Sequence, residues 1–500
     1  MKSFKKIVSM ILALVMMCTM FIPAFAAVDT NVVCPQIYVP GFNTSTIYAD
    51  KNDPGSALGL PGTEEIIQIL KEEIAPAFAV YAIDKDADKL GTVISDMINR
   101  VAAGWYNNPD GSAKDNAGTK FVYPDKKIIK YNSKLNFDYD WRGDPVESAA
   151  QLNDFVNYVY ESTGNKKVAL TCHSMGSIVV LTYIKIYGSD KIMGVVFDSP
   201  AIYGLVSVGE LFSRGTKFDA EGVASILKML IGTTEYEELL SSIIDIFSMA
   251  GINGSISDYL DGAYDRVGSV VFSKSLLPIF GCWPSVWSMI PDEYIDEVMA
   301  DIFANEFSDE AYDGLKAKIE NYNNLVRKNK TQILLDYDAV GRVAVISRYG
   351  YNSVPMTKEW NMLSDAVIET TNTSMGATTA KMGDCFSDEY LAGKDMKYIS
   401  PDKTVDASTC LFPEKTWFIK NTQHSEPDVT KPYYDKLLFT AEEATCENSE
   451  VPRFTIYDRE NDVTVADESV PVKAEKPTIF DRIFNFVKAL INKFLDLFKK

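Results

Sequence analysis

The chain has 500 residues and carries 49 Lys and Arg against 69 Asp and Glu, which gives a formal net charge of −20. This acidic balance argues against nucleic acid as a partner, because nucleic-acid binders usually present basic surfaces. At about 150 residues per domain the length allows several domains, although large α/β enzymes reach this size as one body. None of the seven cysteines forms a CxxC pair or a Cys/His cluster with metal-ligand spacing, so we expect no metal and no cofactor.

The first 26 residues have the three-part pattern of a secretory signal peptide. Lysines lie at the start, an almost entirely apolar run covers residues 7–22, and Ala24-Phe25-Ala26 is a small-x-small cleavage site. We therefore expect a secreted protein whose mature part begins near Ala27. Six cysteines follow, and outside the cell an even count permits disulfides. No later apolar run reaches the roughly 18 residues that a membrane-spanning helix needs.

Residues 27–200 predict the first part of an α/β core. Short apolar strands alternate with helical patterns, which is typical of a parallel sheet covered by helices. We expect strands at 35–40, 168–171 and 194–197, and helices at 146–160 and 177–187. Residues 47–126 are predicted to be an insertion, part helical, with a loop rich in Gly, Asn and Asp at 107–118.

The next segment changes to one helical pattern after another. We expect residues 201–330 to form a helical cap, which includes a helix opened by the capping box of Thr234 and Glu237 and closed by Gly251. Strand patterns at 343–347 and 416–419 indicate that the core resumes over residues 331–446.

Two segments complete the chain. Residues 447–477 are polar and punctuated by proline, so we expect a linker or a small β excursion. Residues 478–500 predict an amphipathic helix with a wide apolar face and a net basic charge, in contrast to the acidic remainder. This pattern is typical of helices that lie in a membrane interface, and docking on the catalytic body or pairing with another copy is the alternative.

The segment Thr171-Cys172-His173-Ser174-Met175-Gly176 lies between a predicted strand and a predicted helix. A serine at such a junction sits on a sharp turn that exposes its hydroxyl above the sheet, and the turn needs small residues on both sides. The usual pattern is G-x-S-x-G, so Cys172 is a departure, but it is small enough. We predict Ser174 as the nucleophile, with Gly176 allowing the close turn.

The chain has only two histidines, His173 and His424. A serine nucleophile needs a base, and imidazole is the side chain best suited to that role near neutral pH. His173 adjoins the nucleophile and is expected to point away from it. His424 is therefore predicted as the base, in a loop that follows a strand late in the chain.

An acidic residue should orient the base, and it should lie between the strand at 343–347 and His424. We select Asp365, in Ser-Asp-Ala-Val-Ile, and keep Asp384, Asp338 and Asp336 as alternatives.

The oxyanion hole requires two backbone N–H groups aimed at the developing negative charge. The N–H of Met175, directly after the nucleophile, is expected to supply one. The N–H of Phe42 is expected to supply the other, since Gly41 permits a close approach of the turn that follows the first strand.

Together these motifs resemble the lecithin:cholesterol acyltransferase family, which includes lysosomal phospholipase A2 and bacterial relatives. The resemblance rests on Val39-Pro40-Gly41-Phe42, Tyr139-Asp140-Trp141-Arg142, His173-Ser174-Met175-Gly176, Gln423-His424 and, less specifically, 284–291. It implies an α/β-hydrolase fold and acyl-ester chemistry through an acyl-serine. It also matches Phe42 and Met175 to the family's oxyanion hole. The family's Gly-Asp-Gly-x-Val acid motif is replaced here by Ser-Asp-Ala-Val-Ile.

Asp140, Trp141 and Arg142 have no evident chemical step, so we assign them a supporting role. The leading hypothesis is a secreted serine esterase or acyltransferase that acts on a lipid acyl ester. The alternative is a non-catalytic surface or lipid-binding protein that keeps the hydrolase fold.

Overall fold

A computed structural model describes residues 32–59, 68–69, 72–73, 75–216, 264–354 and 357–471. The expected signal peptide, the helix predicted between Thr234 and Gly251, and the amphipathic helix at 478–500 lie outside these residues. Within them, no helix is both long enough and apolar enough to cross a membrane.

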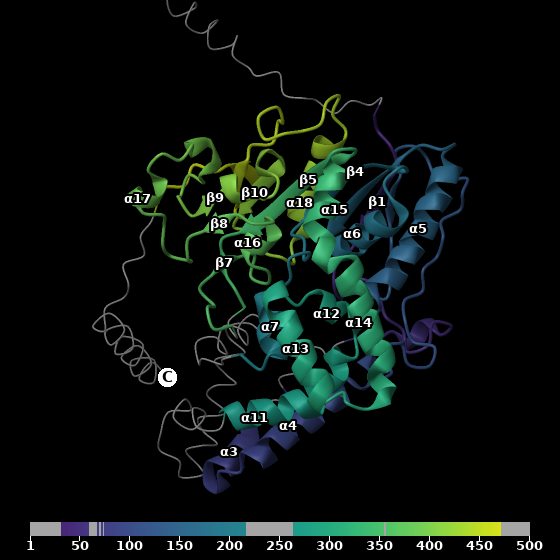
Figure 1. Ribbon diagram of the computed structural model, residues 1–500, viewed down its shortest axis with the longest axis vertical. Coiled ribbons are helices and arrows are strands. Elements are labelled where there is room, and N and C mark those ends of the chain that lie inside the picture. Colours follow the sequence, from purple (N-terminus) through teal and green to yellow (C-terminus); the bar gives the residue numbers. More distant parts are fainter. Residues whose placement is uncertain are drawn as a thin grey trace, which may run out of the picture.

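The fold is α/β, built on an eight-stranded central sheet that is mostly parallel (Figure 1). Its strand order is β12-β11-β10-β5-β4-β3-β1-β2, and only β12 runs antiparallel to its neighbour. The strands are β1 Gln36–Val39, β2 Lys134–Asn136, β3 Val168–His173, β4 Ile192–Asp198, β5 Arg342–Tyr349, β10 Thr416–Lys420, β11 Phe454–Asp458 and β12 Val463–Ala466. Two short hairpins pair β6 Tyr351–Asn352 with β7 Leu363–Ser364, and β8 Thr378–Thr379 with β9 Val405–Asp406.

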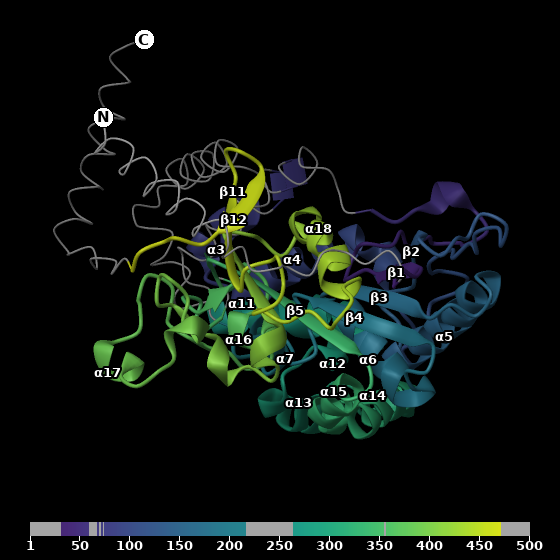
Figure 2. The same cartoon turned by 90° about the horizontal axis from the view of Figure 1, so that it is seen from above.

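Helices cover both faces of the sheet, because alternate residues of each strand point to opposite sides. One face packs Leu170, Val195 and Val345 against α5 Pro145–Ser162, α6 Gly176–Tyr187 and α15 Lys330–Asp338. The other face packs Ala169, Val196 and Ile346 against α18 Pro427–Leu438. Figure 2 shows α18 on the opposite side of the strands from α6 and α15. The central strands are buried on both faces, which explains their continuous apolar sequence.

Helices also form the described part of the region between β4 and β5. They are α7 Val206–Phe212, α11 Tyr264–Val271 with its continuation Phe272–Gly281, α12 Pro284–Ser288, α13 Asp292–Asn305 and α14 Asp313–Leu325. In Figure 1, α7, α12, α13 and α14 lie together below the labelled strands. Helices α3 Ala75–Asp84 and α4 Ala87–Val101, from the 47–126 insertion, lie beyond them beside α11. Two short helices, α16 Thr370–Thr373 and α17 Asp388–Leu391, belong to the segment between β5 and β10.

The stretch 447–477 differs from a plain linker. It supplies β11 and β12, which extend the central sheet beyond β10. Phe454 packs against Phe418 of β10 with the ring centroids 5.3 Å apart, so the apolar residues of this polar stretch are used for sheet packing. The division of the chain into domains stays a prediction.

Candidate active site

Ser174 lies directly after β3, on a turn in which its own backbone conformation is strained. Its φ is 53°, in the left-handed region that non-glycine residues rarely adopt. The turn leads at once into α6, and the Ser174 N–H donates to the carbonyl of Asp198 at 3.1 Å. Strained backbone of this kind is concentrated at functional sites. The residue is 6% exposed, and in the described part of the chain its hydroxyl makes no hydrogen bond.

Two glycines allow the neighbouring segments to approach this turn. A Cβ added at Gly176 would lie 2.2 Å from the Val39 carbonyl oxygen, so α6 could not begin this close to the end of β1 with any larger residue. A Cβ added at Gly41 would lie 2.8 Å from Cβ of Ser174. The loop after β1 therefore packs directly against the predicted nucleophile, as the oxyanion-hole hypothesis requires.

His424 and Asp365 are brought together although 59 positions separate them in sequence. Nδ1 of His424 lies 2.6 Å from Oδ2 of Asp365, and the His424 backbone N–H donates to the Asp365 carbonyl at 2.8 Å. Asp365 is fully buried, whereas the His424 side chain is 13% exposed. The imidazole is thus oriented by a buried carboxylate on one side and reachable from solvent on the other.

The turn that begins at Asp365 orients its carboxylate. Oδ1 accepts the N–H groups of Val367 at 3.1 Å and Ile368 at 2.8 Å, which leaves Oδ2 for His424. Ala366 has a φ of 77°, so an alanine here takes the backbone conformation that glycine adopts most easily. The family's motif has glycine at this position, and the turn forms despite the replacement.

The three alternative acids lie elsewhere. Asp338 pairs with Lys415 at 2.6 Å, Asp336 accepts from Gln332 at 2.7 Å, and Asp384 is exposed. Among the four aspartates considered, Asp365 is the one that contacts His424.

The imidazole of His173 contacts the loop that carries His424. Its Nε2 lies 2.9 Å from the His424 carbonyl oxygen, and the two imidazole centroids are 4.5 Å apart. Burial, together with the positive charge of Arg348, holds the pKa of His173 well below its ordinary value. The ring is therefore neutral, and it must carry its proton on Nε2 to donate to that carbonyl.

This depressed pKa predicts a pH dependence of stability. Below about pH 6.5 the unfolded chain binds a proton at His173 that the folded chain does not, so the free energy of unfolding should fall as the pH is lowered. One such group contributes a slope of about 1.4 kcal/mol per pH unit. Urea unfolding between pH 7.5 and 5.5 should show a shallower slope in His173→Asn than in the native protein. Equal slopes would contradict the assignment.

The motif Tyr139-Asp140-Trp141-Arg142 supports the loop after β1. The Tyr139 hydroxyl donates to the Pro40 carbonyl at 2.9 Å, and Nε1 of Trp141 donates to the Ser45 carbonyl at 3.0 Å. Arg142 is fully buried and donates two hydrogen bonds to the Asp140 carboxylate, at 3.0 and 2.7 Å. In the described part of the chain none of these side chains contacts Ser174 through a hydrogen bond, which agrees with a supporting role.

Phe42 is the large apolar residue of this loop, and 41% of it is exposed. Its ring packs on Trp141 with the centroids 4.4 Å apart, and Trp283, directly before α12, lies next to both. Within the described residues neither the Phe42 N–H nor the Met175 N–H donates to another group. Both donors are therefore available to a ligand oxygen.

The sequence patterns do not single out two charged residues that lie at the site. Arg348, near the end of β5, and Asp198, the last residue of β4, form an ion pair in which both side chains are fully buried. The sequence feature that could have revealed them is a charged residue at the carboxyl end of each of two apolar strands. Active sites of parallel sheets are built at these strand ends.

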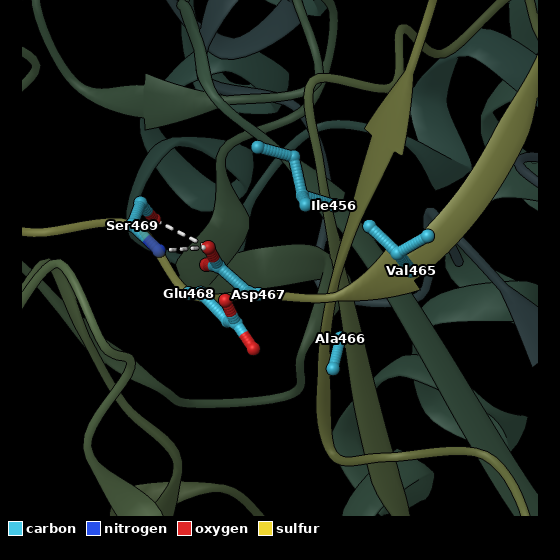
Figure 3. A pocket seen from close by; sticks show the side chains of 6 residues that line it. All are labelled: Ile456, Val465, Ala466, Asp467, Glu468 and Ser469. Carbon is cyan, nitrogen blue, oxygen red and sulfur yellow. Dashed lines mark hydrogen bonds between the residues drawn. The ribbon is translucent and has the colours of Figure 1, made fainter. Parts of the chain in front are cut away.

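Other features of the described residues offer no competing site. They contain no group of three or more His, Cys, Asp or Glu side chains that could hold a metal ion, and their six cysteines are free thiols. A surface pocket lies beside β11 and β12, at the far end of the sheet from β1 (Figure 3). Its lining includes Asp467, whose carboxylate accepts both the N–H and the hydroxyl of Ser469, and it includes no histidine.

Comparison with known families matches the model of the lecithin:cholesterol acyltransferase family to residues 129–227. This segment contains the Tyr-Asp-Trp-Arg motif and the Ser174 turn. Over these residues the chain is similar to that family. The match confirms the resemblance seen in the sequence.

No curated protein matches the chain. A chain in the crystal structure of a Tle4–Tli4 complex matches with 14% identity and a TM-score of 0.20, over 37% of this chain and 48% of that chain. The match spans about half the length of that solved chain.

Proposed function

We propose that the protein is a secreted, serine-dependent hydrolase or acyltransferase of lipid acyl esters. One arrangement carries the proposal. Ser174 lies on its strained turn, His424 pairs with Asp365, and the loop that carries His424 contacts His173, the residue before Ser174. The similarity to the lecithin:cholesterol acyltransferase family supports lipid acyl chemistry in general.

In the proposed mechanism, Ser174 Oγ attacks the ester carbonyl while Nε2 of His424 takes the serine proton. Because Nδ1 of His424 donates its proton to Asp365, the lone pair for this step is on Nε2. The N–H groups of Phe42 and Met175 stabilise the oxyanion of the tetrahedral intermediate. His424 then gives the proton to the leaving alcohol, and an acyl-serine remains.

Water or a second alcohol resolves the acyl-serine by the same steps in reverse order. Hydrolysis and transfer share the first half-reaction, so an assay of products with and without an alcohol acceptor separates them. No hydrogen bond joins Ser174 to His424 in the described residues. Catalytic hydrogen bonds often become short only when substrate is bound.

A fluorophosphonate probe tests the proposal directly. The native protein should be labelled covalently, and Ser174→Ala should abolish the labelling. Ser199→Ala is a matched control, because Ser199 directly follows the neighbouring strand β4 in the same left-handed conformation, with a φ of 45°, and its buried hydroxyl has no hydrogen-bond partner among the described residues. Labelling that survives in Ser174→Ala would rule out this nucleophile, and a native protein that is never labelled would favour the non-catalytic lipid-binding alternative.

Secretion and membrane contact are part of the proposal, and both rest on sequence patterns at the ends of the chain. Residues 1–26 support export, and the basic amphipathic residues 478–500 support peripheral contact with anionic lipid. Truncation after Lys476 should abolish sedimentation with anionic vesicles and leave hydrolysis of a soluble ester unchanged. Pelleting of the truncated protein with vesicles would refute the membrane role.

A further inference from the structure

The buried ion pair of Arg348 and Asp198 contacts both halves of the candidate site. Its geometry is bidentate: Nε of Arg348 lies 3.1 Å from Oδ1 of Asp198, and Nη2 lies 2.5 Å from Oδ2. Both side chains have no exposed surface. Asp198 is the last residue of β4 and Arg348 is the next to last of β5, so the pair joins the carboxyl ends of two adjacent strands.

On one side the pair reaches the nucleophile. The Asp198 carbonyl accepts the Ser174 N–H at 3.1 Å, so the residue that holds the arginine also fixes the strained turn. On the other side it reaches the base. Nη1 of Arg348 donates to the carbonyl of His424 at 2.8 Å and to that of Gln423 at 3.2 Å.

The remaining contacts complete the pair's hydrogen bonding. Nη2 of Arg348 donates to the Thr430 hydroxyl at 2.9 Å, so all five N–H donors of the guanidinium are used. Asp198 Oδ2 also accepts from the Thr430 and Tyr434 hydroxyls, both in α18, which begins just after the His424 loop. Burial and the Asp198 carboxylate hold the pKa of Tyr434 well above its ordinary value, so that phenol stays a donor.

We propose that Arg348 and Asp198 are positioning residues that set the separation between Ser174 and His424. This inference rests on the proposed function. The two catalytic side chains follow different strands, β3 and β10, and Arg348–Asp198 connects their backbones through the two strands between them, β4 and β5. His173 donates to the same His424 carbonyl, so the base is held from two directions.

Stability alone is a poor explanation for this pair. Desolvating two charges is costly, and apolar residues of similar volume often stabilise a protein as well as a buried ion pair does. What the pair supplies is direction, because a planar guanidinium with all donors occupied fixes each acceptor relative to the others. A shift of about 1 Å between reacting groups can lower a rate by about 10²-fold.

The variant Arg348→Lys distinguishes the positioning role of the arginine from the effect of its positive charge. Lysine keeps the positive charge beside Asp198, but a single ammonium cannot span the carboxylate and both loop carbonyls. Arg453→Lys is the matched control: Arg453 is also buried, pairs with Glu414 and donates to the Pro413 carbonyl, but it lies by the opposite end of β10 from His424.

We expect Arg348→Lys to lower kcat on a soluble ester by about 10²-fold with little change in KM, under conditions where circular dichroism shows it folded. Arg453→Lys should keep the native kcat whatever its thermal stability. The inference is overturned if folded Arg348→Lys keeps the native kcat, or if both variants lose activity in proportion to their loss of stability.

A spectroscopic measurement on the same variants tests the positioning role independently of catalytic activity. The chain has two histidines, so ¹³C-histidine labelling gives an NMR spectrum with two imidazole environments to assign. The His424 signals should move in Arg348→Lys and stay in place in Arg453→Lys. If the native protein hydrolyses no ester, the proposed function fails, while unmoved His424 signals in Arg348→Lys would refute the positioning role by itself.

Discussion

Replacing His424 with alanine is expected to lower kcat by a factor of thousands or more while the fold is retained. The only other histidine, His173, is neutral, buried and engaged with the His424 carbonyl, so no second imidazole can take the serine proton. In serine hydrolases with this mechanism, loss of the base alone costs up to about 10⁶-fold in kcat. Steady-state hydrolysis of a chromogenic fatty-acyl ester measures the effect.

The double variant Ser174→Ala/His424→Ala provides the control. Nucleophile and base act as one unit, so the double variant should be no slower than the worse single variant. Effects that multiply would mean that the two residues act independently. Turnover within tenfold of the native rate in His424→Ala would exclude histidine as the base.

Asp365→Asn is expected to lower kcat by about 10⁴-fold with little change in stability. Asparagine can keep the turn, because its amide oxygen can accept the N–H groups of Val367 and Ile368 as Oδ1 does now. Its NH₂ group would then face Nδ1 of His424, and the imidazole would carry its proton on Nε2. In that tautomer Nε2 cannot accept the serine proton.

Asp384→Asn is the comparison, because Asp384 lies in the same segment between β5 and β10 and is exposed. It should leave kcat within about twofold of the native value, as expected of a surface substitution away from the site. A severe loss in Asp384→Asn and a mild one in Asp365→Asn would move the acid to position 384 and leave the serine mechanism standing.

Much of the sheet can be predicted from local sequence. Val168 to Thr171 and Val343 to Ser347 are apolar runs that form buried parallel strands, and both are observed as β3 and β5 with ends within two residues. The stretch 447–477 was harder to interpret, because β11 and β12 are short, and β12 is largely exposed at the sheet edge. An edge strand carries little of the apolar signal by which strands are recognised.

Some residues of the candidate site can likewise be predicted from local sequence, and others cannot. Ser174 could be found because the small residues of its turn are adjacent in sequence, and His424 because the chain has so few histidines. Arg348 and Asp198 could not be paired from sequence, since 150 positions separate them and only the strand order makes them neighbours. Local patterns thus predict the reacting groups, and the tertiary fold alone reveals what positions them.

The acyl-serine intermediate is the most direct test of the central claim. The native protein should be mixed with an excess of an activated fatty-acyl ester, stopped in acid within the first turnovers, digested and analysed by peptide mass spectrometry. The account predicts that the peptide containing Ser174 gains the mass of the acyl group and that Ser174→Ala shows neither the adduct nor turnover. An acyl group found on another residue, or turnover that persists in Ser174→Ala, would contradict it.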